Sequence, residues 1–483
     1  MSTPGRLLIV SNRLPVGAAL SDGMVTLTMA DGGLATGMRP WHEKSNGLWI
    51  GWPGDVSGFS AAQHTELDQQ LRRRGITAVH LTSDHVDRYY HGFANRVLWP
   101  LFHYLIDRVP LNAAGWDAYR AANEAFAGVV AREYQPGDAI WVHDYQLTLL
   151  PALLRQRLPE ARIGFFLHIP FPASEVFRVL PWRKEILQGL LGADLLGFHT
   201  RAYVRYFTNA LERILGIVAD GDHVAAGGRT IRLGDYPMGI DAERFARLAR
   251  DPDVQAEAAT IRSEAGGRQI VLGVDRLDYT KGIPRRLEAI EHLLGEQPEL
   301  ADSVRFIQVA VPSRGEVDSY QKFKRLVEEA VGRINGARST IRSTPVHYVH
   351  RSVPERRLVA LYCAADVMLV TPLRDGMNLV AKEFVATRVH DDGVLVLSEF
   401  AGAAAELESA LIVNPYDVES VAATIQRALT LPLEERRARM MRLRQRVHEY
   451  DVHVWAGEFI EHLWRSPDEA AVAPAVRSGV MTR

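Results

Sequence analysis

Short runs of apolar, often β-branched residues recur along the whole chain, separated by amphipathic stretches long enough to form helices. Such runs predict buried strands, and strands that alternate with helices predict parallel sheets covered by helices on both faces. The predicted strands are residues 7–10, 139–142, 163–167, 195–198, 231–236, 270–274, 304–311, 346–349, 367–370, 394–397 and 410–413.

Two of the intervening stretches, residues 203–215 and 352–365, show clear helical periodicity. The second opens with Ser352-Val353-Pro354-Glu355, so a hydroxyl residue precedes a glutamate by three positions and a proline falls in the first turn. This spacing is typical of a capping box, and we expect the helix to begin at Ser352.

The chain of 483 residues exceeds what one hydrophobic core usually supports, so at least two domains are expected. A boundary is predicted after residues 236–240, because residues 241–268 are polar and charged until the next strand. The predicted fold is α/β, with two doubly wound halves that leave a deep cleft between the carboxyl ends of their strands. Residues 466–483 are rich in alanine, proline and polar residues, which predicts disorder.

Composition narrows the class of protein. The net charge is -2, from 56 basic and 58 acidic residues, which argues against nucleic acid or an anionic membrane as a partner. Cys363 is the only cysteine, so neither an intrachain disulfide nor a cysteine zinc cluster is possible, and its apolar setting predicts an inert thiol. No apolar run approaches the roughly 18 residues of a membrane span, and no signal-peptide pattern precedes the first strand. We expect a cytoplasmic enzyme that binds small molecules.

The most informative segment is residues 371–383, where a strand passes through a polar turn with a glycine into a helix. Helix N-termini in such turns bind anions. Here Asp375 stands before the helix and Glu383 lies within it. Carboxylates accept hydrogen bonds from hydroxyl groups, so a phosphate attached to hydroxyl-rich groups suits this segment better than phosphate alone. That description fits a nucleotide sugar.

A basic segment follows the strand predicted for residues 270–274. Arg276 and Lys281 lie where ligands of parallel sheets bind, and two such cations can neutralise a diphosphate leaving group without a metal ion. The alternative is a pair of surface charges bridged to Asp275 and Asp278. Their place after a strand favours the ligand-binding interpretation.

Two further segments suggest phosphate binding. Arg314 follows the strand 304–311 beside a glycine, but it could equally cap a helix. Arg13 follows the first strand, and Gly32 and Gly33 would let backbone N–H groups approach a phosphate, although a plain turn fits these glycines better. The chain contains no Gly-Lys dipeptide, which excludes a P-loop.

Polar and aromatic residues near other strand ends complete the candidates. Asp144 could bind sugar hydroxyls or act as a base, and His168 could contact a sugar, but both could simply cap strands. Tyr90 and Trp99 could stack on a sugar ring or belong to the core. No metal-binding motif is present, and no metal or other cofactor is expected.

Taken in order, these motifs closely resemble the α,α-trehalose-6-phosphate synthases, which are retaining nucleotide-sugar glycosyltransferases. The resemblance covers residues 7–464. It is carried by Ser11-Asn12-Arg13, Leu98-Trp99-Pro100, His143-Asp144-Tyr145, Phe166-Leu167-His168-Ile169-Pro170-Phe171-Pro172, Arg276-Leu277-Asp278-Tyr279-Thr280-Lys281-Gly282, Ser313-Arg314-Gly315 and Asp375-Gly376-Met377-Asn378-Leu379-Val380-Ala381-Lys382-Glu383.

The resemblance implies a GT-B fold of two Rossmann-like domains: an acceptor domain of residues 1–240 and a nucleotide-sugar domain of residues 241–453. A last helix, residues 454–465, would return to the first domain. UDP-glucose would bind Arg276, Lys281, Asp375 and Glu383, together with the helix N-terminus formed by Asn378, Leu379 and Val380. Gly33 and His168 would close over this donor, and the backbone near Val353 would contact its base. Glucose-6-phosphate would bind Arg13, Tyr90, Trp99, Asp144 and Arg314.

The resemblance further implies a front-face displacement, in which the departing β-phosphate takes the acceptor proton. Catalysis would then involve Arg276, Lys281, His168 and Asp144. Two alternatives stay open: a transferase with another phosphorylated acceptor, and a regulatory subunit that binds sugar phosphates without catalysis. The donor base (uridine, adenine or guanine) is also open, and the resemblance favours a homo-oligomer.

Overall fold

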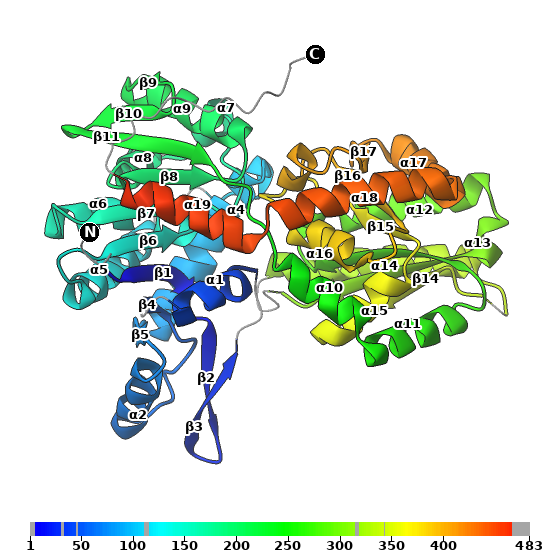
Figure 1. Cartoon of the computed structure of the whole chain (residues 1–483), viewed down its shortest axis with the longest axis horizontal. Coiled ribbons are helices and arrows are strands. Elements are labelled where there is room, and N and C mark those ends of the chain that lie inside the picture. The colour runs from blue at the N-terminus through cyan, green and yellow to red at the C-terminus, as the bar shows by residue number, and fades with distance from the viewer. Residues whose placement is uncertain are drawn as a thin grey trace.

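The computed structural model describes residues 5–29, 33–44, 47–110, 115–313, 318–341 and 343–465. These residues form two lobes, each built around its own sheet (Figure 1). The predicted α/β fold with two largely parallel sheets is confirmed. The tail predicted to be disordered, residues 466–483, lies outside the described residues.

In the described part of the chain the first sheet has nine strands. From β5 to β11 neighbouring strands run parallel, and β10 and β9 add an antiparallel edge. Its central strands are buried along almost their whole length, as expected for a sheet covered on both faces. In spatial order the strands are β5 (Ile76–Ala78), β4 (Leu48–Trp52), β1 (Leu7–Arg13), β6 (Ala139–His143), β7 (Arg162–Phe166), β8 (Leu195–Phe198), β11 (Arg229–Asp235), β10 (His223–Ala226) and β9 (Ala219–Asp220).

The second sheet has six parallel strands among the described residues. In spatial order they are β14 (Val346–Val349), β13 (Val304–Val311), β12 (Gln269–Arg276), β15 (Val367–Val370), β16 (Val394–Ser398) and β17 (Leu411–Val413). Every strand predicted from the apolar runs is present, with ends that differ by a few residues.

Helices and helical turns connect the strands. Those before and between the strands of the first sheet are α1 (Gly33–Lys44), α2 (Ala61–Arg72), α3 (Ser83–Val86), η1 (Asp87–Leu98), α4 (Trp99–Phe102), η2 (Ile106–Arg108), α5 (Trp116–Glu133), η4 (Tyr145–Leu147), α6 (Leu150–Arg157), α7 (Ser174–Phe177), α8 (Arg183–Leu190) and α9 (Arg201–Leu215). Those that follow are α10 (Ala242–Arg250), α11 (Pro252–Glu264), η5 (Tyr279–Lys281), α12 (Ile283–Glu296), α13 (Leu300–Ser303), α14 (Asp318–Arg338), α15 (Glu355–Ala364), α16 (Leu379–Thr387), η6 (Gly402–Ala405), α17 (Val418–Thr430), α18 (Leu433–Glu449) and α19 (Val452–Trp464).

Several strands near the N-terminus were not predicted, because they do not form continuous apolar runs in the sequence. The hairpin β2 (Val16–Ser21) and β3 (Met24–Met29) projects from the first lobe and is exposed over much of its length (Figure 1). Strand β4 contains Gly51, where an added Cβ atom would lie 2.7 Å from the Ser11 carbonyl oxygen. A glycine inside a strand usually lowers the strand signal, but here it permits a close approach between neighbouring backbones.

The helix predicted to begin at Ser352 begins instead at Glu355, so the capping-box prediction is wrong. Pro354 occupies the N-cap with ψ 145°, and no side chain caps the helix. The residue before a proline is held in an extended conformation, so Val353 cannot belong to a helical first turn. The Glu355 carboxylate pairs with Arg244 at 2.6 Å rather than folding back on the N-terminus.

The last helix lies on the first sheet, although it follows the second sheet in sequence (Figure 1). Predicted for residues 454–465, it spans Val452–Trp464. Its Phe459 ring stacks on Trp141 of β6 with 4.4 Å between centroids, and Trp455 packs 5.2 Å from the same ring. The backbone N–H of Val452 donates to the Ile240 carbonyl at 3.0 Å, so the two crossings between the lobes lie side by side.

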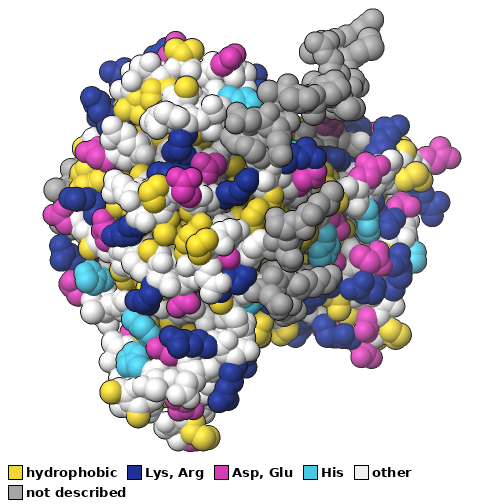
Figure 2. Space-filling model, turned by 60° about the vertical axis from the view of Figure 1, so that its left-hand side comes forward, with side chains coloured by type: hydrophobic (Ala, Val, Ile, Leu, Met, Phe, Trp, Pro, Cys, Tyr) yellow, Lys and Arg dark blue, Asp and Glu magenta, His cyan; other side chains and the backbone are white. Residues whose placement is uncertain are grey.

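Acidic and basic side chains are interspersed over the face drawn in Figure 2, as the near-zero net charge predicts. Among the described residues, no helix is both long enough and apolar enough to cross a membrane.

Candidate active site

The turn between β15 and α16 brings its acid against the predicted cation. The Asp375 carboxylate accepts from Lys281 Nζ at 2.5 Å and from Asn378 Nδ2 at 3.0 Å. Burial alone would raise the pKa of Asp375, but the charge and hydrogen bond of Lys281 outweigh it, so the pKa is lower than usual and the carboxylate stays charged. Lys281 and Asp375 are thus held together as a buried ion pair.

Helix α16 begins with an unusual backbone conformation. Asn378, its N-cap, has φ +72°, in the left-handed region that few residues other than glycine adopt. The turn directs the first backbone N–H groups of α16, those of Leu379 and Val380, away from any partner inside the helix. With the helix dipole, backbone N–H groups in such a position can bind an anion.

Glu383 lies one turn into α16 and is half-buried. It accepts a hydrogen bond from the Tyr362 hydroxyl at 2.9 Å. Burial raises its pKa to about 7, although the Tyr362 bond opposes this. The side chain can therefore change charge near neutral pH.

The two predicted cations lie at the end of β12. Strand β12 extends to Arg276, which is therefore its last residue rather than part of a loop, and Lys281 ends the turn η5. The predicted alternative, a pairing of these cations with Asp275, is wrong. Asp275 instead forms a fully buried pair with Arg286 at 2.5 Å. The Arg276 guanidinium is exposed and lies 5.4 Å from the Trp99 ring centre in the other lobe.

On the first lobe, Asp144 and His168 lie together at the ends of β6 and β7. The backbone N–H of His168 donates to Asp144 Oδ1 at 3.1 Å, and Asp144 itself has φ +75°. His143 Nδ1 lies 3.1 Å from His168 Nε2, and His199 Nε2 lies 3.1 Å from the His168 carbonyl oxygen. Burial lowers the pKa of all three imidazoles well below the usual value, so they are neutral near pH 7.

Arg13 and Tyr90 approach the same aromatic ring. The Arg13 guanidinium lies 4.9 Å from the Trp52 ring centre, and the Tyr90 ring lies 6.3 Å from it. Arg13 is exposed at the end of β1, whereas Trp99 is buried to 5% exposure. The open question between core and ligand contact therefore receives different answers: Trp99 belongs largely to the core, and Tyr90 is partly accessible.

The two lobes touch at this point. A Cβ atom added to Gly376 would lie 2.1 Å from the His168 carbonyl oxygen, so only glycine allows the Asp375 turn to approach the end of β7 so closely. The Tyr203 hydroxyl donates to the Asp375 carbonyl at 3.0 Å, and Arg374 lies over the Tyr104 ring at 3.9 Å. The structure thus brings the Asp375 turn, Lys281, His168 and Asp144 into one interlobe region.

Four other predicted residues are less informative. Val353 is partly buried and precedes α15. Gly33 is the first residue of α1, so a helix begins at the second of the two glycines for which a plain turn was the alternative. Gly32 and Arg314 lie outside the described residues.

Sequence reasoning missed two residues that support the site, Tyr203 and His199. His199 directly follows strand β8, so the rule that drew attention to His168 could have found it. Tyr203 lies within α9, and nothing in its spacing indicates contact with the other lobe.

The profile of glycosyltransferase family 20 matches residues 5–465. The chain belongs to glycosyltransferase family 20. One member, the trehalose-6-phosphate synthase of Mycobacterium avium, is 45% identical over 475 residues, covering 95% of both chains.

Two solved structures of this family share the architecture. An α,α-trehalose-phosphate synthase (UDP-forming) from Burkholderia xenovorans, in complex with glucose-6-phosphate, is 37% identical with a TM-score of 0.86, covering 95% of this chain and 100% of its own. A second, from E. coli and bound with UDP-2-fluoro glucose, is 38% identical with a TM-score of 0.86, covering 95% of this chain and 99% of its own. The resemblance inferred from the motifs is therefore confirmed.

Proposed function

We propose that this protein is an α,α-trehalose-phosphate synthase (UDP-forming) of family 20. It transfers glucose from UDP-glucose to glucose-6-phosphate, with retention, and forms α,α-trehalose 6-phosphate and UDP. The observation that carries the proposal is the contact of Lys281 with Asp375 at the N-terminus of α16, facing His168 of the other lobe. A cation, a carboxylate and a helix N-terminus close together support a site for a nucleotide sugar.

This geometry and the family resemblance support the following roles for the donor residues. Arg276 and Lys281 would hold the diphosphate together with the backbone N–H groups of Leu379 and Val380. Asp375 would accept from glucose hydroxyls, and Glu383 from the ribose hydroxyls. Asn378 supports Asp375 through the hydrogen bond between their side chains. Gly33 and His168 would close over the donor. The backbone near Val353 would contact the base.

The acceptor would lie against the first lobe. Asp144, oriented by its bond from the His168 backbone, would accept from acceptor hydroxyls. Tyr90 and Trp99 would line the sugar, and Arg13 would bind the phosphate together with Arg314. Arg13 is exposed and its guanidinium contacts an aromatic ring, so a phosphate could reach it.

In the reaction, the bond between glucose C1 and the β-phosphate oxygen breaks, and the acceptor hydroxyl attacks C1 from the same face. The hydroxyl proton passes to the departing β-phosphate oxygen. Arg276 and Lys281 would stabilise the negative charge that grows on this phosphate. Contact between the lobes would exclude water and so suppress hydrolysis of the donor.

The proposal retains the division into residues 1–240, residues 241–453 and a returning helix, 454–465. It also includes a cytoplasmic location and a homo-oligomeric assembly.

The test is direct. Purified protein is mixed with UDP-glucose and glucose-6-phosphate without divalent metal, and the products are identified by mass spectrometry and NMR. We expect a phosphorylated, non-reducing disaccharide and UDP. Parallel reactions with ADP-glucose and GDP-glucose identify the preferred base. Failure to form the disaccharide with any donor would refute the proposal.

A further inference from the structure

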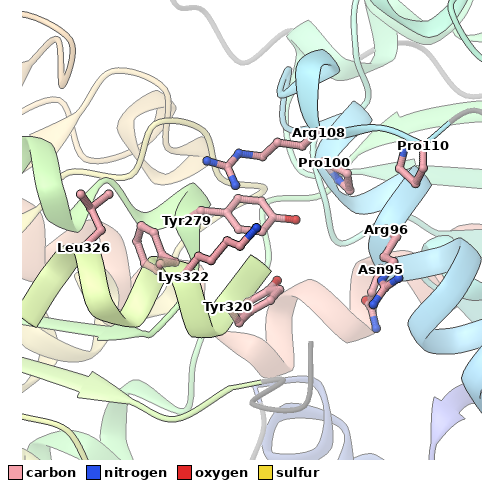
Figure 3. A pocket seen from close by; sticks show the side chains of 10 residues that line it. Asn95, Arg96, Pro100, Arg108, Pro110, Tyr279, Tyr320, Lys322 and Leu326 are labelled. Atoms are coloured by element: carbon pink, nitrogen blue, oxygen red, sulfur yellow. The ribbon is translucent and has the colours of Figure 1, made fainter. Parts of the chain in front are cut away.

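A separate cavity of about 530 Å³ lies between the lobes beside the proposed site (Figure 3). One wall comes from η1 and the segment that follows it, and the other from η5 and α14. Among the residues that the structure describes, none of those proposed for either substrate lines it. The lining residues are Asn95, Arg96, Pro100, Arg108, Pro110, Tyr279, Tyr320, Lys322, Phe323 and Leu326.

The cavity is basic. Arg96, Arg108 and Lys322 contribute three cations, and the described lining residues include no aspartate or glutamate. Within the described chain none of these three cations belongs to an ion pair, although Arg108 lies 4.9 Å from the Tyr279 ring centre. In the part of the chain that the structure describes, no acidic side chain of the lining offsets these three exposed cations, so the cavity would attract an anion.

The floor is apolar and aromatic. Tyr279, Tyr320 and Phe323 are buried to 6% exposure or less, and Leu326 is 50% exposed at the edge. Asn95 is 3% exposed, and its Nδ2 has no hydrogen-bond partner among the described residues, whereas its Oδ1 accepts from Tyr145. A buried amide donor without a partner is costly, but Nδ2 is not exposed to the cavity and so gives no contact for a ligand.

We propose that this cavity binds a nucleoside polyphosphate that is neither donor nor acceptor, with its base on the aromatic floor and its phosphates between Arg96, Arg108 and Lys322. The aromatic residues of the lining suit a nucleobase, and three cations suit a polyphosphate better than a single phosphate. Because the cations come from both lobes, the ligand would hold the lobes together next to the loop that carries Lys281. The inference is independent of the reaction that the neighbouring site catalyses.

The test is calorimetric titration of ATP into the intact protein, with the donor site saturated by UDP. We expect ATP to bind, and Lys322→Glu to weaken binding at least tenfold. Lys324→Glu is the matched control, because Lys324 lies on the same helix, does not line the cavity and pairs with Glu328. Equal effects of the two variants would overturn the proposal.

Two further binding measurements identify the chemistry of the ligand. Inorganic pyrophosphate should bind more weakly than ATP if the base contacts the aromatic floor, and equal binding would overturn that part. Displacement of ATP by UDP or by glucose-6-phosphate would assign the cavity to the catalytic site and overturn the proposal. The measurements do not require turnover, so their failure is distinct from failure of the proposed reaction.

Discussion

His143 Nδ1 lies 3.1 Å from His168 Nε2, so a fully buried imidazole contacts the one that faces the interlobe site. Burial keeps both rings neutral, and one proton therefore lies between these nitrogens. His143 Nε2 has no partner among the described residues. A buried N–H without an acceptor is rarer than a buried unprotonated ring nitrogen without a donor, so His143 carries its proton on Nδ1 and not on Nε2. His143 Nδ1 then donates to His168 Nε2, and the neutral His168 ring carries its own proton on Nδ1, where it can act as a donor.

We therefore predict that His143→Leu lowers kcat/KM about tenfold, the cost of one hydrogen bond that orients a catalytic group. His143→Asn is the matched control, because its amide can still donate towards His168, and it should stay within about threefold of the native value. Steady-state kinetics and thermal unfolding test this. Equal losses in both variants with unchanged stability would contradict the tautomer assignment.

Glu383 should make donor affinity depend on pH. Its pKa of about 7 means that it is largely neutral at pH 6 and charged at pH 8. A charged carboxylate accepts from hydroxyls more strongly, so KM for UDP-glucose should rise by up to about tenfold from pH 8 to pH 6. Glu383→Gln should flatten this dependence; a variant with the native pH profile would show that Glu383 does not contact the donor.

The same group should affect stability with a definite sign. The pKa is raised from 4.5 in the unfolded chain to about 7 in the folded one, so the folded state holds a proton that the unfolded state has lost between these values. The contribution of Glu383 to the free energy of unfolding therefore falls as pH rises from 4.5 to 7. Urea unfolding of the native protein and of Glu383→Gln at pH 5 and pH 7 measures the difference.

Asn378 combines a backbone and a side-chain role that two substitutions can separate. Asn378→Ala should lower the free energy of unfolding by about 1–2 kcal/mol, because alanine is disfavoured at φ +72°. Asn378→Gly should be close to native in stability. Both should lose activity, because both remove the hydrogen bond to Asp375. Full activity of the glycine variant would confine the residue to a backbone role.

The buried pair Arg286–Asp275 should support the end of β12. Arg286→Leu leaves an uncompensated carboxylate in the core and should cost about 3–5 kcal/mol of unfolding free energy. The neighbouring Arg285 pairs with Glu288 at the surface, so Arg285→Ala should cost less than about 1 kcal/mol. The free energies of unfolding of the two variants are compared by denaturant unfolding. Similar losses of unfolding free energy would show that Asp275 is not left unpaired.

Arg314 was assigned to the acceptor phosphate from its motif. Arg314→Ala should raise KM for glucose-6-phosphate at least tenfold and change KM for UDP-glucose little, since one charged hydrogen-bonded contact is worth about 1.5–3 kcal/mol. Arg325→Ala, an exposed arginine on α14, is the control. Equal increases in both KM values would refute the assignment.

The amino-acid sequence by itself determined the fold class and most candidate residues. Buried parallel strands are continuous apolar runs, so they are visible without any partner, and ligands of such sheets lie at strand ends. Arg276, Asp144 and His168 could be found in this way because each lies at or beside the end of a predicted strand. The ordered motifs then indicated the family.

Only the tertiary structure decided which of these residues meet. Lys281 and Asp375 lie on neighbouring strand ends far apart in sequence, and no local pattern distinguishes this pair from Lys281 with Asp278. Gly376 acquires its role from the His168 carbonyl in the other lobe, and Tyr203 from the Asp375 carbonyl. The raised pKa of Glu383 arises from burial. Ion pairing, close approach and desolvation depend on distances through space, and these exist only once the two sheets have been brought together.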